Sequence, residues 1–355
     1  MESIKVLVVD DSALMRKIVS DMLNEKSDIY VVDTARNGQD ALEKIKKLNL
    51  DVITLDVEMP IMNGIDTLKE LKKCNINLPV IMLSGFTKES TRLTMECLGL
   101  GAFDFISKPS GAISIDINKV QDELVLKVRA AFQECLSRGN CRVKKLSVDS
   151  KQENYKDKID KISFSGIEAV VIGASTGGPK AVYNVITKFP KNIGVPIFIV
   201  QHMPAGFTKA FAERLNSNSE IEVVEAKEGE IYEKNIAYVA PGGFHMEVKS
   251  DGRIHLNKEP AIWGVRPAVD KLFKSASEVF KNKIISVVLT GMGKDGAEGT
   301  KVIKQKGGIT ISEDESTCVI YGMPKMAYET GAVDFVIPLD KIAQEIIKIV
   351  HGIRR

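Results

Sequence analysis

The sequence predicts an α/β protein built from two doubly wound domains, each with a mostly parallel sheet between layers of helices. Two observations support this prediction. With 355 residues, the chain exceeds the usual size of a single hydrophobic core. Short apolar runs such as KVLVV alternate with amphipathic segments such as ALEKIKKLN. This alternation is typical of strands and helices that succeed one another in a parallel sheet.

The first half of the chain contains five strand–helix units. Their strand-like runs are KVLVV, YVVDTA, DVITLD, LPVIMLS and AFDFIS, and each is followed by a helical pattern. Five such units predict a flavodoxin-like, doubly wound domain over residues 1–125. The sequence then loses its periodicity and becomes polar and charge-dense, as linkers do. We therefore assign the end of the last helix and a linker to residues 126–163.

A second α/β pattern begins with the strand-like run EAVVIGAS. Further strand-like runs are VPIFIVQ, IAYVA, ISVVLT and DFVIP. The segment MEVKSDGRIHLNK predicts an antiparallel hairpin that turns at Asp251 and Gly252. Residues 164–352 are thus expected to form a second doubly wound domain, mostly parallel, with this hairpin as an insertion.

Composition argues against several classes of protein. Lysine and arginine number 49 and aspartate and glutamate 47, so no basic surface for nucleic acid is indicated. No apolar run is long enough to insert into a membrane, and the amino terminus lacks the features of a signal peptide. The five cysteines form no C-x-x-C pair, which favours reduced thiols. We expect a cytoplasmic protein.

Polar residues gather where the strands of the first half end. Asp10 and Asp11 follow the first strand, Asp56 ends the third, and Ser84 and Lys108 follow the fourth and fifth. At one sheet edge, three carboxylates repel one another unless a cation joins them, and Mg²⁺ suits such oxygen ligands. This pattern predicts phosphorylation of Asp56, with the lysine neutralising phosphoryl oxygens and the serine binding the product. For any single acid, a helix cap is an equally good explanation.

The motifs VVDDS, LDVEMP, MLSG and SKP resemble those of response-regulator receiver domains. The resemblance implies phosphorylation at Asp56 by a chemotaxis histidine kinase. It also implies a Mg²⁺ site formed by Asp10, Asp11 and Asp56, and signalling through the serine and lysine named above. Phe105 takes the position of the family's switching aromatic residue, although a phenylalanine that only fills the core explains this position equally well.

The stretch GASTGGPKA, which begins at Gly173, has two interpretations. A phosphate-binding P-loop requires lysine directly after the last glycine and then serine or threonine, but Pro179 and Ala181 break this pattern. A nucleophile turn requires a strand, a glycine-rich turn and a helix, which this segment supplies. The second interpretation makes Ser175 the nucleophile.

A serine nucleophile needs a base and a group that orients the base. His202 follows a predicted strand and should lie at the same sheet edge as Ser175, which favours it as the base. The other histidines fit less well; they are His245, near the predicted hairpin and at its surface or in the cleft, His255 and His351. Asp295 stands in a glycine-rich loop after a strand, whereas Asp270 is inside a helical stretch. We therefore expect Asp295 to orient the base.

The motifs VIGASTGGP, VQHMP, VAPGG, RPAVD and LTGMGKDG resemble the catalytic domain of chemotaxis protein-glutamate methylesterases. The resemblance implies the same three residues, Ser175, His202 and Asp295, and hydrolysis of γ-glutamyl methyl esters on methyl-accepting chemotaxis receptors. It also implies deamidation of receptor glutamines and activation by phosphorylation. Ala268 replaces a serine that many relatives have, which puts any contact of that hydroxyl in doubt.

Other residues complete the expected mechanism, for which the esterase reaction needs no cofactor. Backbone amides of Thr176 and Met292 are candidate oxyanion donors. Arg266 is a candidate for binding a substrate carboxylate, although a solvated salt bridge is the commoner role of an arginine. The rival hypothesis is a phosphorylation-gated binding module without catalysis.

Overall fold

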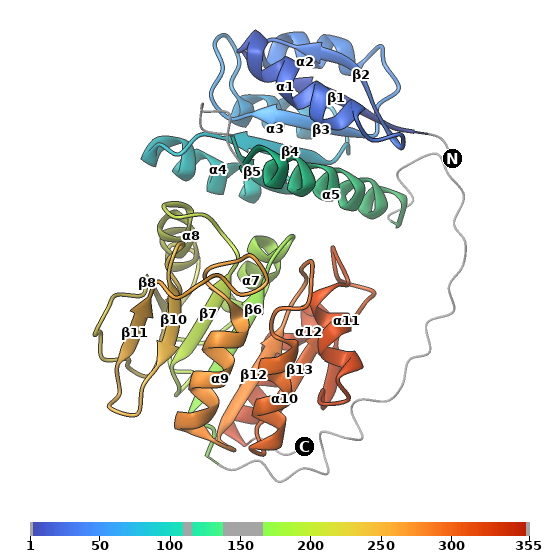
Figure 1. Cartoon of the computed structure of the whole chain (residues 1–355). Helices are drawn as coiled ribbons and strands as arrows, with labels where there is room; N and C mark the ends of the chain where they lie inside the picture. The colour runs from blue at the N-terminus through green and yellow to red at the C-terminus, as the bar shows by residue number, and fades with distance from the viewer. Residues whose placement is uncertain (1–2, 109–115, 138–165, 353–355) are drawn as a thin grey trace. The chain divides into compact units, whose positions relative to one another are not determined.

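The computed structural model describes residues 3–108, 116–137 and 166–352, which fall into two compact units (Figure 1). The predicted linker over residues 138–163 lies outside the described residues. The two units are described separately below.

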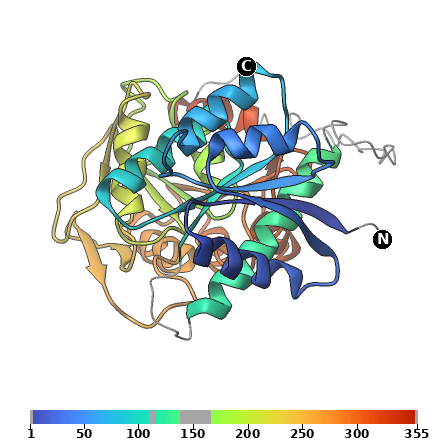
Figure 2. The same ribbon diagram turned by 90° about the horizontal axis from the view of Figure 1, so that it is seen from above.

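The first unit is a five-stranded parallel sheet in the order β2-β1-β3-β4-β5. Its strands are β1 (Ile4–Val9), β2 (Ile29–Ala35), β3 (Val52–Asp56), β4 (Val80–Ser84) and β5 (Asp104–Ser107). Its helices are α1 (Ala13–Asn24), α2 (Gly38–Ile45), α3 (Gly64–Lys73), α4 (Lys88–Leu100) and α5 (Asp116–Ser137). Helices α1 and α5 cover one face of the sheet, and α2, α3 and α4 cover the other (Figure 2).

Local sequence explains where the helices of this unit begin. The first four each start after a polar side chain that accepts a backbone N–H of the first turn; these residues are Ser12, Asn37, Asn63 and Thr87. Ser12, which directly follows the two acids, is thus the residue that caps α1. The strands β3 and β4 are buried along their whole length, because helices cover both faces.

The second unit is a seven-stranded parallel sheet in the order β14-β13-β12-β6-β7-β9-β8. Its strands are β6 (Ala169–Ala174), β7 (Ile197–Gln201), β8 (Glu222–Glu225), β9 (Ile236–Val239), β12 (Ile284–Val288), β13 (Ile309–Glu313) and β14 (Phe335–Ile337). Its helices are α7 (Gly178–Ile186), α8 (Phe207–Asn216), α9 (Val269–Phe280), α10 (Ala297–Gln305), α11 (Met323–Glu329) and α12 (Leu339–His351). The predicted hairpin is β10 (His245–Val248) paired antiparallel with β11 (Ile254–Asn257).

The predicted fold class is confirmed, including the hairpin insertion. Strands β8 and β13 were not predicted. Their sequences, EVVE and ITISE, mix polar with apolar residues, so they do not stand out from the sequence as apolar runs do. The core of the second unit includes an aromatic cluster in which Phe198 of β7 stacks on Tyr238 of β9 at 5.7 Å and lies 6.3 Å from Phe280 of α9.

Each sheet has a topological switch point, at which successive strands stop being placed on one side of the first strand and are placed on its other side. In the first unit this point lies between β1 and β3, and in the second between β6 and β12. The connections on either side of such a point leave in opposite directions, which opens a crevice at the carboxyl ends of the two strands. Polar loop residues that follow these strands are therefore placed to bind a ligand.

The cysteines differ in one respect from the expectation of reduced thiols. Cys74, Cys97 and Cys318 are free, but Cys135 is disulfide-bonded, so the expectation is wrong there. The fifth, Cys141, lies outside the described residues. In the described part of the chain, none of the helices combines the length and the apolar character needed to cross a bilayer.

Candidate functional site

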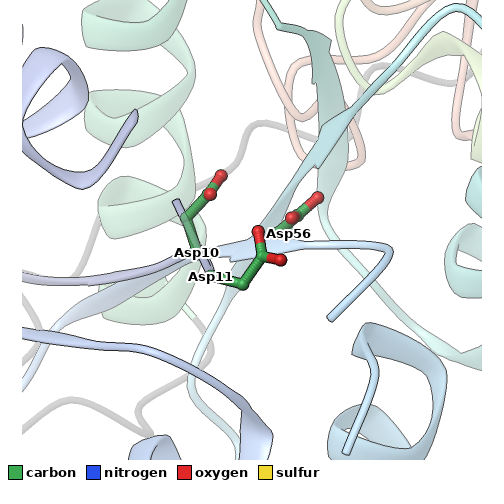
Figure 3. Close-up of side chains that lie close together, drawn as sticks. All are labelled: Asp10, Asp11 and Asp56. Carbon is green, nitrogen blue, oxygen red and sulfur yellow. The ribbon is translucent and has the colours of Figure 1, made fainter. Parts of the chain in front are cut away.

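The first candidate site is a group of three acids at the edge of the first sheet. One carboxylate oxygen from each of Asp10, Asp11 and Asp56 lies within 4.8 Å of the others, and Figure 3 shows the three side chains together. Asp10 and Asp56 are buried and Asp11 is exposed. Lys108 joins them, with its Nζ 2.8 Å from Asp10 and 2.7 Å from Asp56. The structure thus assembles residues from the ends of three strands, as the sequence predicted.

The charges of this site do not balance, because one lysine faces three carboxylates. Burial raises the pKa of Asp56 to about 6 against the opposing effect of Lys108, and repulsion from Asp10 adds to the rise. Burial disfavours the charged form of Lys108, but its contacts with the two carboxylates outweigh burial and leave its pKa raised. A second cation would relieve the excess negative charge, and three converging carboxylate oxygens are suitable ligands for Mg²⁺.

Ser84 and Phe105 lie on β4 and β5, the strands that follow β3 in the sheet. Ser84 ends β4, which pairs with β3, and its hydroxyl donates to the Gly85 carbonyl at 3.1 Å and accepts from Thr94 at 2.6 Å. Phe105 is buried in β5, with the ammonium of Lys127 5.3 Å from its ring centre. Its burial is compatible with a core-filling residue and with the inward state of a switch.

The second candidate site begins where β6 and β7 end side by side. Ala174 pairs with Gln201, so the next residues, Ser175 and His202, are neighbours across the two strands. The His202 N–H donates to the Ala174 carbonyl at 3.0 Å. Gln201 ties both turns together, because its buried side-chain amide donates to the carbonyls of Ser175 at 2.8 Å and His202 at 3.1 Å. Sequence reasoning missed this role of Gln201.

His202 contacts the predicted acid directly. Its Nε2 lies 2.8 Å from Oδ2 of Asp295, and the side chains are 10% and 2% exposed. This contact occupies Nε2 and leaves Nδ1 as the ring nitrogen available for a second partner. Among the described residues, no hydrogen bond joins the Ser175 hydroxyl to the ring, which is common in enzymes without bound substrate.

Asp295 is held by backbone amides on both of its oxygens. Oδ2 accepts the Val269 N–H at 2.6 Å, and Oδ1 accepts those of Asp270 at 2.9 Å and Gly296 at 3.0 Å. Two of these donors belong to the first turn of α9, where the positive end of the helix dipole stabilises a negative charge. Ala268, the residue before α9, has no side chain that could cap the helix, and Asp295 caps it instead.

Asp270 makes the reciprocal contact, which the sequence did not reveal. Its Oδ1 accepts the N–H groups of Gly296 at 3.1 Å and Gly299 at 2.7 Å, at the start of α10. Its Oδ2 accepts the Trp263 indole N–H at 3.2 Å. Burial raises the pKa of Asp270, and the charge of Asp295 adds to the rise. Asp270 does lie in a helix, as the sequence predicted. It nevertheless lies next to Asp295, because both carboxylates accept the Gly296 N–H.

The two candidate oxyanion donors lie in loops that approach Ser175. Thr176 is the next residue, and Gly177 then adopts a positive φ of 76° before α7 begins. In the other loop, a side chain on Gly291 would come within 2.7 Å of the Ser175 Cβ, so this position requires glycine. Within the described residues, the backbone N–H groups of Thr176 and Met292 donate no hydrogen bond, which leaves both able to bind an oxyanion.

The remaining predicted residues lie in other arrangements. Arg266 donates from Nη1 to the carbonyls of Lys258 at 3.0 Å and Glu259 at 2.8 Å, so part of its guanidinium braces its own loop. His245 is wholly buried between Pro260 and Ala268, which rules out the surface role considered for it. His351 ends α12 and is exposed.

Comparison with known proteins agrees with this geometry. A family model described as CheB methylesterase matches residues 170–346, and one described as response regulator receiver domain matches residues 6–116. A protein-glutamate methylesterase/protein-glutamine glutaminase of Clostridium acetobutylicum is 58% identical, with 100% of each chain covered. This chain belongs to the CheB methylesterase family.

Other relatives support the same assignment. The protein of the same description from Pyrococcus abyssi is 47% identical over 99% of this chain and 95% of its own. The crystal structure of the Thermotoga maritima CheB methylesterase catalytic domain matches with a TM-score of 0.51 and 48% identity, covering 52% of this chain and 99% of that one. The family expected from the sequence, and its class as carboxylic ester hydrolases, are thereby confirmed, and the rival hypothesis of a binding module without catalysis is set aside.

Proposed function

We propose that this member of the CheB methylesterase family hydrolyses γ-glutamyl methyl esters by an acyl-enzyme mechanism that uses Ser175, His202 and Asp295. The observation that carries the proposal is the contact of His202 with Asp295, whose other acceptor positions are filled by backbone amides. An acid held in this way cannot turn away from the imidazole. It therefore orients the ring and stabilises the positive charge that the ring acquires.

The steps follow from this arrangement. The Ser175 oxygen attacks the ester carbonyl carbon while Nδ1 of His202 takes the hydroxyl proton. The negative charge on the carbonyl oxygen is stabilised by the N–H groups of Thr176 and Met292. The imidazolium then returns the proton to the leaving methoxide, which departs as methanol. Water, deprotonated by His202, cleaves the acyl-enzyme to glutamate and free serine.

Deamidation uses the same steps with a different leaving group. A glutamine side chain presents an amide carbonyl to Ser175, and the imidazolium protonates the departing nitrogen, which leaves as ammonia. The names of the relatives include a glutaminase, which supports this second activity. We propose chemotaxis receptors as the protein substrates of both reactions.

The first unit supplies regulation. We propose that Asp56 accepts a phosphoryl group from a histidine kinase, with Lys108 neutralising its oxygens and Ser84 turning to bind it. Asp10, Asp11 and Asp56 would hold Mg²⁺, which supplies positive charge that offsets the charge of the transferred group. Phosphorylation is expected to raise the esterase rate of the full chain.

Methanol release from a methylated receptor tests the proposal. The full chain should release methanol faster when Mg²⁺ and a small phosphodonor such as acetyl phosphate are present. The Asp56→Asn chain should retain the basal rate and show no acceleration. Absence of methanol release by the native chain under both conditions would refute the proposed activity.

A further inference from the structure

Glu313 carries a buried carboxyl group that the proposed mechanism does not use. It is the last residue of β13 and is wholly buried. Its Oε2 accepts the backbone N–H of Thr290 at 2.7 Å, and its Oε1 accepts the hydroxyl of Thr317 at 3.1 Å. Burying a carboxyl group is costly, so the contacts that it makes need an explanation.

Thr290, the partner of Glu313, contacts the nucleophile turn in two ways. Its carbonyl accepts the N–H of Ser175 at 3.0 Å, and its hydroxyl donates to the carbonyl of Thr176 at 3.1 Å. The same hydroxyl accepts the N–H of Ile320 at 2.9 Å. Thr290 thus uses its N–H, its carbonyl and its hydroxyl to join β13 to the turn that carries the nucleophile.

The loop that carries Met292 depends on the same contacts. The Gly291 N–H donates to the carbonyl of Ile320 at 3.1 Å, and its carbonyl accepts from Met323 at 2.7 Å. Ile320 is itself held by the Thr290 hydroxyl. The two candidate oxyanion donors, Thr176 and Met292, therefore lie on loops that meet at one residue, and Glu313 holds the backbone of that residue.

We propose that Glu313 is a positioning residue for ester hydrolysis, which through Thr290 holds the loops of Ser175 and Met292 at the spacing that the transition state requires. This inference rests on the proposed mechanism. Glu313 itself does not touch the substrate. Its loss should therefore lower kcat and leave KM unchanged, because the ground-state ester does not need both oxyanion donors in place.

The carboxyl group also titrates in a useful range. Burial raises the pKa of Glu313 to about 7 against the opposing hydrogen bonds from Thr290 and Thr317, and the charge of the neighbouring Asp314 adds to the rise. Cys318, the other titratable neighbour, lies with its Sγ 3.9 Å from the Glu313 carbonyl. The ionised carboxylate accepts both hydrogen bonds. Protonation replaces one acceptor position with a donor, so the hold on Thr290 should weaken below neutral pH.

The experiment compares Glu313→Ala with Glu313→Gln in the full chain, using methylated receptor, Mg²⁺ and acetyl phosphate. Alanine leaves the Thr290 N–H without an acceptor, and kcat should fall roughly 10- to 100-fold. This is less than the roughly 100- to 1000-fold loss on removing an oxyanion donor, because the donors would be displaced and not removed. Glutamine retains an acceptor oxygen, so it should recover most of kcat. Because glutamine does not titrate, the fall of kcat toward acid pH should be less steep than in the native chain.

Two further variants separate positioning from folding. Thr290→Val removes the hydroxyl contacts with little change of shape, and should lower kcat without changing KM even if Glu313→Ala folds poorly. Asp334→Asn is the matched control, because Asp334 accepts the Thr310 N–H at 3.0 Å near the other end of β13. It should alter the unfolding temperature and leave kcat unchanged.

The outcomes are distinct. A kcat of native size in folded Glu313→Ala and Thr290→Val would overturn the inference. Equal losses of kcat in these variants and in Asp334→Asn would also overturn it, since they would indicate a general effect of strand stability. Full activity of Ser175→Ala, assayed alongside, would overturn the proposed mechanism instead. Loss of kcat in Glu313→Ala with recovery in Glu313→Gln supports the inference.

Discussion

Both units place a buried aspartate at the carboxyl edge of a parallel sheet, but they satisfy its charge differently. Asp56 has one close cation, Lys108 at 2.7 Å, and a weak backbone contact from Glu58 at 3.4 Å. Asp295 accepts three backbone N–H groups between 2.6 and 3.0 Å and also contacts His202. One carboxylate remains incompletely satisfied, and the other has its acceptor positions filled.

This difference corresponds to the proposed roles. A carboxylate that must bind a metal ion and attack phosphorus needs oxygens that are free to form new bonds, and the raised pKa of Asp56 reflects that its charge is not fully stabilised. A carboxylate that must orient an imidazole needs the opposite, namely contacts that fix it.

The largest effect is expected from Ser175→Ala and His202→Ala. Each should lower kcat roughly 10⁴-fold or more, because either residue alone cannot form the acyl-enzyme. The double variant should lose little beyond either single variant. Methanol release, with circular dichroism to verify folding, provides the measurement. Native activity in either single variant would show that the nucleophile or the base lies elsewhere.

Asp295→Asn should lower kcat by roughly 10³- to 10⁴-fold, since the amide presents an N–H₂ group where backbone donors or the imidazole need an acceptor. The start of α9 should also be destabilised, by about 1 kcal/mol. The pair of measurements is kcat and the unfolding midpoint in urea. A variant that loses stability but keeps kcat would assign Asp295 to helix capping alone.

Asp56→Asn should abolish phosphate uptake from acetyl phosphate and with it the acceleration of methanol release. The basal rate should remain, because the proposed steps of ester hydrolysis use residues of the second unit. Asp51→Asn is a matched control. Asp51, which accepts the Lys5 N–H at 2.8 Å, directly precedes the first residue of β3, whereas Asp56 is the last. Intact-mass spectrometry reports the phosphoryl group, and labelling that persists in Asp56→Asn would contradict the assignment.

Mg²⁺ binding to the full chain should weaken as pH falls below about 6, where Asp56 takes up a proton. With one competing proton, the affinity should decline by up to about tenfold per pH unit. The stability of the metal-free protein should change with pH in the opposite direction to its Mg²⁺ affinity. The raised pKa means that the metal-free folded state binds more protons than the unfolded state between about 4 and 6. Stability contributed by this group therefore increases as pH falls through that window.

Calorimetric titration of Mg²⁺ at pH 7, 6 and 5 tests this dependence. Asp56→Asn serves as the control, because it should bind more weakly and show a smaller pH dependence in this range. Equal affinity of the native chain at pH 5 and pH 7 would mean that Asp56 is not a ligand.

The smallest effect is expected from Asp270→Ala. The change leaves the Gly299 N–H without its acceptor and removes one of the two acceptors of the Gly296 N–H, which keeps Asp295. It should reduce stability by about 1 to 3 kcal/mol. We expect only a few-fold loss of kcat, since Asp295 retains its own donors. Trp263→Phe, which removes one hydrogen bond to Asp270, should change both quantities less. A loss of kcat as large as that of Asp295→Asn would mean that the two acids act as a pair.

Much of each site follows from local sequence. Strand-like runs that end in a polar residue, together with the rule that parallel strands end at one edge, predict Asp10, Asp56 and Lys108 as residues of one site. Ser175 was selected because glycines and a proline mark a strand–turn–helix element within a few residues. These signals are short-range, so no knowledge of strand order is needed to detect them.

Sequence alone is therefore enough to predict the fold class and the family, and to single out the residues at strand ends for which we propose catalytic or phosphoacceptor roles. The residues that support them become visible only in the folded chain. The side chains of Gln201, Asp270 and Glu313 contact backbone groups of neighbouring loops. Such contacts exist only once β13, β12, β6 and β7 lie next to one another. Backbone N–H and carbonyl groups are the same in nearly every residue. When a side-chain carboxyl or amide binds such a group, the residue type of its partner therefore gives no signal in the sequence.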